Sequence, residues 1–231
     1  MDDRSKPDAG SIVRGEAREL RSAFSRHWLR FSLLFAALLL PMWLFLELAD
    51  EVREGEPLPF DEPILMFAQQ AAREGFDRVF LFFSKIGYEW GVVPFDVLLV
   101  VALAIMRRFR QSVFAAIALG GSALLNLATK QLFARERPTL WESIAPESTF
   151  SFPSGHAMGS MTLAMVLVLL AWPTKLRWWV VGAMLVFVPM VGLSRIYLGV
   201  HYPSDILAGW AVACVWVVGV YMAFFGPWRR E

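Results

Sequence analysis

Long apolar stretches recur along this chain, and short polar segments separate them. They cover Phe31–Leu46, Val97–Met106, Val113–Ala128, Ala157–Trp172, Trp178–Leu193 and Ile206–Phe225. A helix needs about 20 residues to cross the hydrocarbon core of a bilayer, and aromatic and basic residues flanking the shorter stretches can complete each span. No segment alternates with a period of two over strand lengths, as a membrane barrel would. The pattern predicts an all-α integral membrane bundle of six transmembrane helices, the second beginning near Tyr88 or Trp90.

Composition supports the membrane class. Hydrophobic residues make up 57% of the 231-residue chain and charged residues only 19%, which is far from the average of soluble proteins. The formal net charge of +1 does not point to a partner. We expect a membrane lipid partner and no nucleic acid, and the oligomeric state stays open.

The distribution of basic residues predicts which way the chain faces. Fourteen of the 22 Lys and Arg residues lie in residues 1–30, the loop at 107–110, the loop at 175–177 and the C-terminus. Six crossings place these four segments on one side, which the positive-inside rule makes cytoplasmic. The sequence therefore predicts a multi-pass protein of the plasma (inner) membrane, with the other loops on the extracytoplasmic side.

Two further segments carry weaker signals. Residues 1–30 form a basic tail that is either an amphipathic helix on an anionic membrane surface or a solvated segment that sets topology. The remaining residues, 31–228, are expected to form one membrane domain. Within it, Asp50–Pro63 reads as an external loop, and Ile64–Ile86 reads as one or two partly amphipathic helices along the outer surface.

Three polar blocks adjoin the apolar helices on the side predicted to be extracytoplasmic. The first contains Lys130 and Arg137, which are seven residues apart and followed by Pro138. If the helix continues through this block, the two cations share one face and suit a phosphate. The alternative is that both reach lipid head groups. Arg135 and Glu136 are expected to meet solvent or each other.

The second block, Pro153-Ser154-Gly155-His156, precedes an apolar helix. Free backbone N–H groups at a helix start bind anions, and Gly155 lets a ligand approach the backbone. Ser154 either caps the helix or donates to a phosphate oxygen. His156 has no evident structural reason to be there, and its natural role is proton donor to a leaving oxygen.

The third block runs from Ser194-Arg195 to His201 and Asp205. The four-residue spacing lets the Asp205 carboxylate reach one ring nitrogen of His201, which leaves the other nitrogen free to attack. Arg195 can return to the same anion. An ordinary interfacial His–Asp pair is the alternative for these residues in isolation. Near lipid such polar groups are costly, which favours a function for them.

Together the blocks read Lys-x6-Arg-Pro, Pro-Ser-Gly-His and Ser-Arg-x5-His-x3-Asp, unbroken and in order. In this the sequence resembles the type 2 phosphatidic acid phosphatase family, which shares a site with vanadium haloperoxidases. The resemblance implies a phosphatase without metal or cofactor that works through a phosphohistidine. It implies that Lys130, Arg137, Ser154, Gly155 and Arg195 hold phosphate, that His156 is the acid, and that His201 is a nucleophile oriented by Asp205.

We therefore expect a membrane enzyme that hydrolyses a lipid phosphate or diphosphate with an extracytoplasmic active site. Undecaprenyl diphosphate, phosphatidylglycerol phosphate and phosphatidic acid all fit, and the sequence does not choose among them. Two other classes stay open. A vanadate-dependent haloperoxidase would use the same anion site, and a non-catalytic membrane lipid-binding protein would need more polar groups deep in the bundle than Asp96, Asn126 and Thr129.

Overall fold

The structure, a computed structural model, describes residues 32, 35–55 and 58–226, and every regular element within them is a helix. The predicted all-α class is confirmed for these residues. Helical residues 35–54 come first. The remaining helices are α2 (Asp61–Gln70), α3 (Glu74–Ile86), α4 (Val92–Ile105), α5 (Phe109–Phe133), α6 (Gly155–Ala171), α7 (Arg177–Tyr197) and α8 (Pro203–Phe225).

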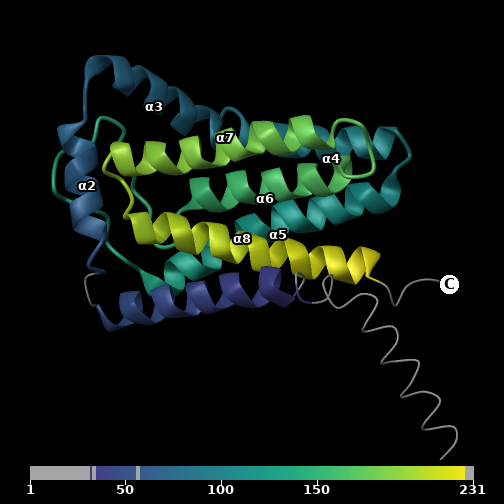
Figure 1. Cartoon of the computed structure of the whole chain (residues 1–231), viewed down its shortest axis with the longest axis horizontal. Helices are drawn as coiled ribbons and strands as arrows, with labels where there is room; N and C mark the ends of the chain where they lie inside the picture. The colour runs from purple at the N-terminus through teal and green to yellow at the C-terminus, as the bar shows by residue number, and fades with distance from the viewer. Residues whose placement is uncertain (1–31, 33–34, 56–57, 227–231) are drawn as a thin grey trace, which may run out of the picture.

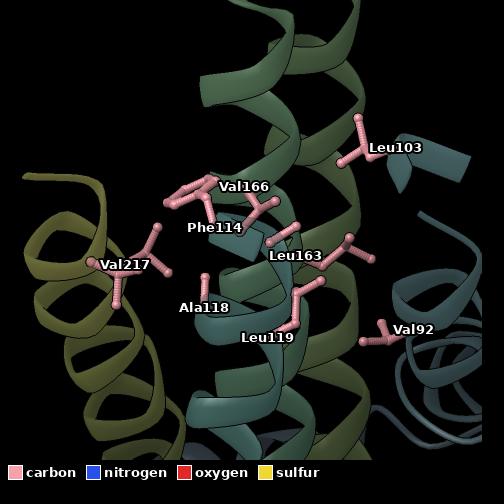
Figure 2. Packing of buried hydrophobic residues seen from close by; sticks show 10 residues of the cluster. Val92, Leu103, Phe114, Ala118, Leu119, Leu163, Val166 and Val217 are labelled. Atoms are coloured by element: carbon pink, nitrogen blue, oxygen red, sulfur yellow. The ribbon is translucent and has the colours of Figure 1, made fainter. Parts of the chain in front are cut away.

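Helix α6 lies at the centre of the bundle, where it packs against α5, α7 and α8 (Figure 1). Its neighbours meet around a core in which Phe114 of α5, Val166 of α6 and Val217 of α8 are fully buried (Figure 2). Close contact between α6 and α8 depends on Gly209, because a Cβ there would lie 2.9 Å from the Ser154 carbonyl oxygen. This packing fixes the starts of α6 and α8 relative to each other.

Several helices are apolar enough to lie in a membrane. Helices α5, α7 and α8 have the length and composition to cross one, whereas α4 and α6 are apolar but shorter. Large apolar side chains point outward along them, including Ile105, Leu132 and Trp179 with exposed fractions of 77–80%. Such a surface is suited to lipid. The chain is a membrane protein, and the count of six crossings stays a prediction.

The segment at 64–86 forms two helices, as expected. Helix α2 contacts α7 and α8, and it lies across one end of the bundle in Figure 1. Helix α3 then runs back along α7. Hydrogen bonds from Tyr197 to the Asp77 carboxylate and the Arg73 carbonyl hold this pair of helices to the end of α7. Residues 61–86 therefore cover one end of the bundle with α2 and continue along α7 with α3.

Exposed basic residues mark the end of the bundle opposite α2. Arg107 and Arg108 lie between α4 and α5, and Lys175 lies between α6 and α7, all at the end opposite α2 (Figure 1). The three polar blocks lie at the α2 end. The basic tail predicted for residues 1–30 lies outside the described residues, and so do residues 227–231.

Candidate active site

Three separate parts of the chain bring the polar blocks together. They are the last turn of α5 with the segment after it, the start of α6, and the link between α7 and α8. The Ser154 backbone N–H donates to the Asp205 carbonyl at 3.0 Å, which joins the start of α6 to the start of α8. The blocks that the sequence analysis treated as one site therefore lie in one place.

Lys130 and Arg137 converge, but not by continuation of the helix. Helix α5 ends at Phe133, and Ala134 takes a left-handed conformation with φ of 44°. Arg137 therefore lies beyond the helix, and the proposed shared helical face is wrong. Both cations nevertheless donate to the Thr149 side chain, from Lys130 Nζ at 3.2 Å and from Arg137 Nη2 at 3.0 Å. The chain returning through Thr149 brings them together.

The second block starts α6 as expected. Ser154 is the N-cap, with its hydroxyl accepting from the Ala157 backbone N–H at 3.5 Å. A Cβ at Gly155 would lie 3.0 Å from the Asn126 side-chain oxygen, so close packing against α5 is a second reason for glycine at this position. The His156 ring lies beside that of Tyr88, tilted by 35° with ring centroids 5.1 Å apart.

His201 lies in the α7–α8 link, fully buried, and its two ring nitrogens have different partners. Nε2 is 3.1 Å from Arg137 Nη1, and Nδ1 is 3.3 Å from Asp205 Oδ2. A guanidinium has no acceptor, so Nε2 must accept the hydrogen bond from Arg137. The ring proton therefore belongs on Nδ1, facing Asp205 and the Ser151 hydroxyl. This is the tautomer in which Nε2 keeps its lone pair.

Asp205 is fully buried at the third position of α8, following Pro203 at the first. Its Oδ2 accepts from the Tyr202 backbone N–H at 2.9 Å and from the Ser151 hydroxyl, while Oδ1 accepts from Arg135 at 2.7 Å. Both carboxylate oxygens are thus held from several directions. The orientation of the His201 ring is fixed by a carboxylate that cannot itself turn.

Arg195 is 1% exposed near the end of α7. Its guanidinium donates to the Ser84 hydroxyl of α3 and to Glu147. Its Nε is buried with no hydrogen-bond partner among the described residues. A buried unused donor next to the other cations is suited to an anion, since leaving it unpaired is costly.

Glu147 is a site residue that the sequence analysis missed. Its carboxylate pairs with Arg137 at 2.7 Å and with Arg195, and it lies 3.8 Å from His156 Nδ1. The residue belongs to an irregular segment between α5 and α6, where no periodicity or motif marks it. In this structure the Glu147 carboxylate thus binds Arg137 and Arg195, two of the side chains that were expected to hold phosphate.

Arg135 was expected to meet solvent or Glu136, and this was wrong. It donates to Asp205 at 2.7 Å and to Asp61 of α2 at 2.9 Å, and its guanidinium lies over the Tyr202 ring. Asp61 in turn accepts from the Ser204 backbone N–H and hydroxyl. These contacts span more than 60 residues of sequence, and nothing near Arg135 in the chain indicates them.

The site is rich in cations, and their field changes the acidity of their neighbours. Burial, reinforced by Arg137, Arg195 and Lys130, holds the pKa of His201 well below its usual value of 6.5, so the ring is neutral near pH 7. Burial alone would raise the pKa of Glu147, but the same cations outweigh it and hold that pKa below its usual value. The site therefore combines an ionised carboxylate with a neutral imidazole.

Among residues 32, 35–55 and 58–226, no three or more His, Cys, Asp or Glu side chains group in a way that would hold a metal ion.

Comparisons with known proteins agree with this geometry. The chain is 27% identical over 176 residues to the phosphatidylglycerophosphatase B of Bacillus subtilis, covering 73% of this chain and 85% of that protein. It is 32% identical over 161 residues to the undecaprenyl-diphosphatase of Sulfolobus acidocaldarius, covering 65% of this chain and 72% of that protein.

The fold has a solved counterpart. The transmembrane PAP2 type phosphatidylglycerolphosphate phosphatase from Bacillus subtilis superposes with a TM-score of 0.74 at 24% identity, covering 85% of this chain and all of that one. The profile of the PAP2 superfamily matches residues 111–229, more than half of the chain, and this region contains all three polar blocks. The resemblance seen in the motifs is thereby confirmed, and this protein is a member of the PAP2 superfamily.

Proposed function

We propose that this protein, a membrane lipid phosphate phosphatase, removes the terminal phosphate of a lipid phosphate or diphosphate through a phosphohistidine formed on His201. The observation that carries the proposal is the placement of the His201 ring. Nδ1 faces Asp205, and Nε2 accepts from Arg137. An anion bound to Arg137 would therefore meet a neutral nucleophile whose lone pair already points toward the cation.

Cations from three parts of the chain are suited to a phosphoryl group. Lys130, Arg137 and Arg195 would neutralise its equatorial oxygens, where charge is held during transfer. The start of α6 adds the Gly155 backbone N–H group, the Ser154 hydroxyl and the positive end of the helix dipole. Glu147 would give up its contacts with Arg137 and Arg195 when phosphate binds.

The reaction proceeds in two steps. Burial and the neighbouring cations lower the pKa of His156 in the free site, and the negative charge of a bound phosphate would offset those cations and let the ring take up a proton. His201 Nε2 attacks phosphorus in line, so that an N–P bond forms as the bond from phosphorus to the lipid oxygen breaks, and the protonated His156 gives its proton to that departing oxygen. Water then attacks the phosphohistidine and gives its proton to His156, the N–P bond breaks, and orthophosphate leaves. Asp205 stabilises the positive charge that His201 carries between the two steps.

Fixed cations supply the charge that a divalent ion supplies in many phosphatases. We therefore propose that turnover needs no metal. The lipid partner belongs to the class of undecaprenyl diphosphate, phosphatidylglycerol phosphate and phosphatidic acid, whose phosphates all lie at the membrane surface. Relatives bearing the names phosphatidylglycerophosphatase B and undecaprenyl-diphosphatase support this class.

We also propose that the site faces away from the cytoplasm in the plasma (inner) membrane. The basic residues Arg107, Arg108 and Lys175 lie at the opposite end of the bundle from the site, which supports this orientation. Together with residues 1–30 as a basic cytoplasmic tail, residues 31–228 would then form the membrane domain.

Phosphate release tests the proposal directly. Purified protein in detergent is given the three lipids named above, and the His201→Ala variant is the control. We expect release from at least one lipid and none from the variant, with both proteins equally folded. Substantial release by His201→Ala would falsify the covalent mechanism, and no release from any lipid by the wild type would refute the activity.

Orientation needs a second experiment. The protein is reconstituted in oriented vesicles, and the active lipid is supplied from one side only. We expect hydrolysis only on the side opposite Arg107 and Arg108, without an energy source. Hydrolysis confined to the side bearing those arginines would reverse the orientation.

A further inference from the structure

Asp61 lies far from the three motifs in sequence but next to them in space. It is the first residue of α2 and is 2% exposed. Its Oδ2 accepts from Arg135 at 2.9 Å and from the Ser204 hydroxyl at 2.6 Å, while Oδ1 accepts from the Ser204 backbone N–H at 2.9 Å. A carboxylate buried to this extent needs all of these donors. It is therefore fixed against both Arg135 and the start of α8.

Arg135 connects Asp61 to the His201–Asp205 pair. Nη1 donates to Asp205 Oδ1 at 2.7 Å and to the Ser204 hydroxyl at 2.8 Å, while Nη2 donates to Asp61. Its guanidinium also lies 4.0 Å from the centroid of the Tyr202 ring. The order of contacts is thus Asp61, Arg135, Asp205, His201, each within hydrogen-bond or ion-pair distance of the next.

The charges along this chain of contacts explain why two carboxylates are present. Arg135 and Asp205 alone would form a neutral pair, in which the arginine offsets part of the stabilisation that the Asp205 carboxylate gives to a cationic ring. Asp61 restores one net negative charge to the group of three. His201 carries positive charge as a phosphohistidine. The negative charge of Asp61 therefore stabilises this intermediate.

We infer that Asp61 is a positioning residue for the nucleophile: it holds Arg135 against Asp205 and gives the Asp61–Arg135–Asp205 group the net negative charge that stabilises His201 when the ring is positive. The inference rests on the proposed function where it concerns turnover, but its electrostatic part concerns the ring alone. It also assigns a function to α2, which no motif covers.

The competing explanation is purely structural, with Asp61 merely tying α2 to α8. The two explanations differ in what they predict for the titration of His201. A unit charge roughly 10 Å away at an effective dielectric constant of about 20 shifts a pKa by about one unit. Removing Asp61 should lower the pKa of His201, whereas removing Arg135 should raise it. If Asp61 only connected α2 to α8, the two substitutions would not be expected to shift the pKa of His201 in opposite directions.

Three variants form the test: Asp61→Asn, Arg135→Gln and the double variant. Other groups that face His201 stay unchanged in all three, namely Lys130, Arg137, Glu147, Asp205, His156 and Arg195. The chain contains only three histidines, so NMR of histidine-labelled protein in detergent resolves the ring, and a His201→Gln variant assigns it.

We expect the His201 midpoint to fall by about one unit in Asp61→Asn, to rise by about one unit in Arg135→Gln, and to return near the wild-type value in the double variant. The fall in midpoint from Arg135→Gln to the double variant measures the effect of Asp61 a second time, in the background in which the ring titrates at the highest pH. Midpoints that move in the same direction, or equal midpoints in Arg135→Gln and the double variant, would overturn the inference.

Activity supplies an independent measurement. Asp61→Asn is expected to lower kcat about 10-fold with KM unchanged, because the missing charge acts on the intermediate and not on binding. Glu62→Gln is the matched control, since Glu62 is the next residue of α2, is exposed and lines the same cavity of about 240 Å³ beside Arg135. Its kcat and the His201 midpoint should stay at the wild-type values.

The two hypotheses fail separately. If no lipid phosphate is hydrolysed but the His201 midpoints shift with opposite signs, the proposed function fails and the electrostatic role of Asp61 stands. If lipid phosphate is hydrolysed and the Asp61→Asn midpoint equals that of Glu62→Gln, the proposed function stands and the role of Asp61 is refuted.

Discussion

Replacing Glu147 with glutamine tests whether this carboxylate competes with a substrate's phosphate for the same cations. One oxygen lies 2.7 Å from Arg137 Nη2, and the other is paired with Arg195. The substitution keeps the shape of the side chain and removes its charge. Both arginines then become available to an oxyanion without displacement of an ionised group.

The expected size follows from the two ion pairs. A hydrogen bond to a charged group is worth about 1.5–3 kcal/mol. The Glu147 side chain is 26% exposed, so water replaces part of what it loses on displacement. We therefore take the two ion pairs of Glu147 together to be worth about 1.5–3 kcal/mol. This corresponds to oxyanion binding that is about 10- to 100-fold tighter in Glu147→Gln.

Competitive inhibition by vanadate measures this affinity without relying on KM. We expect the inhibition constant to fall by that factor in Glu147→Gln, and kcat to fall as well because His156 loses a carboxylate 3.8 Å away that favours its protonated form. Glu142→Gln is the control, since Glu142 is an exposed residue of the same segment. An inhibition constant that is unchanged or higher in Glu147→Gln would refute the idea of competition.

Three further predictions follow from the site. Asp205→Asn should lower kcat by about 10³-fold or more, measured by phosphate release, because the amide does not hold the reactive tautomer. Chelators should leave the rate unchanged; a rate abolished by EDTA and restored by magnesium would contradict the cation-based site. Since the folded protein holds the pKa of His201 well below 6.5, the unfolded chain binds more protons as pH falls below about 6.5. The thermal midpoint should therefore decline on acidification through that range, and less so in His201→Gln.

The sequence was sufficient where local pattern determines structure. Within the described residues, each apolar stretch lies in a helix to within one residue of its end. The short polar blocks at the helix ends lie together because neighbouring antiparallel helices bring alternate loops to the same end. The i, i+4 spacing of His201 and Asp205 likewise predicted a contact that the structure contains. In each of these cases the geometry follows from the helix repeat or from the order of the helices.

The sequence was insufficient where a contact depends on the path of an irregular segment. Helix α5 ends at Phe133, and Ala134 follows in a left-handed conformation. No glycine at this position indicates the end of the helix in the sequence, so helical spacing gave a wrong position for Arg137. Glu147 reaches the arginines only because its segment folds back over them. Asp61 meets Ser204 across 143 positions, and no periodicity links residues so far apart.

The hydrogen bond between Ser154 and Asp205 has a consequence for how different lipids fit. Together with the tight approach at Gly209, it makes the starts of α6 and α8 a single rigid body that carries His156 and Asp205. Head groups of different size cannot be accommodated by spreading these two helices. Adjustment to head-group size would then fall to the largely exposed irregular chain from 139 to 150, so the breadth of substrates accepted depends on how far that segment can yield.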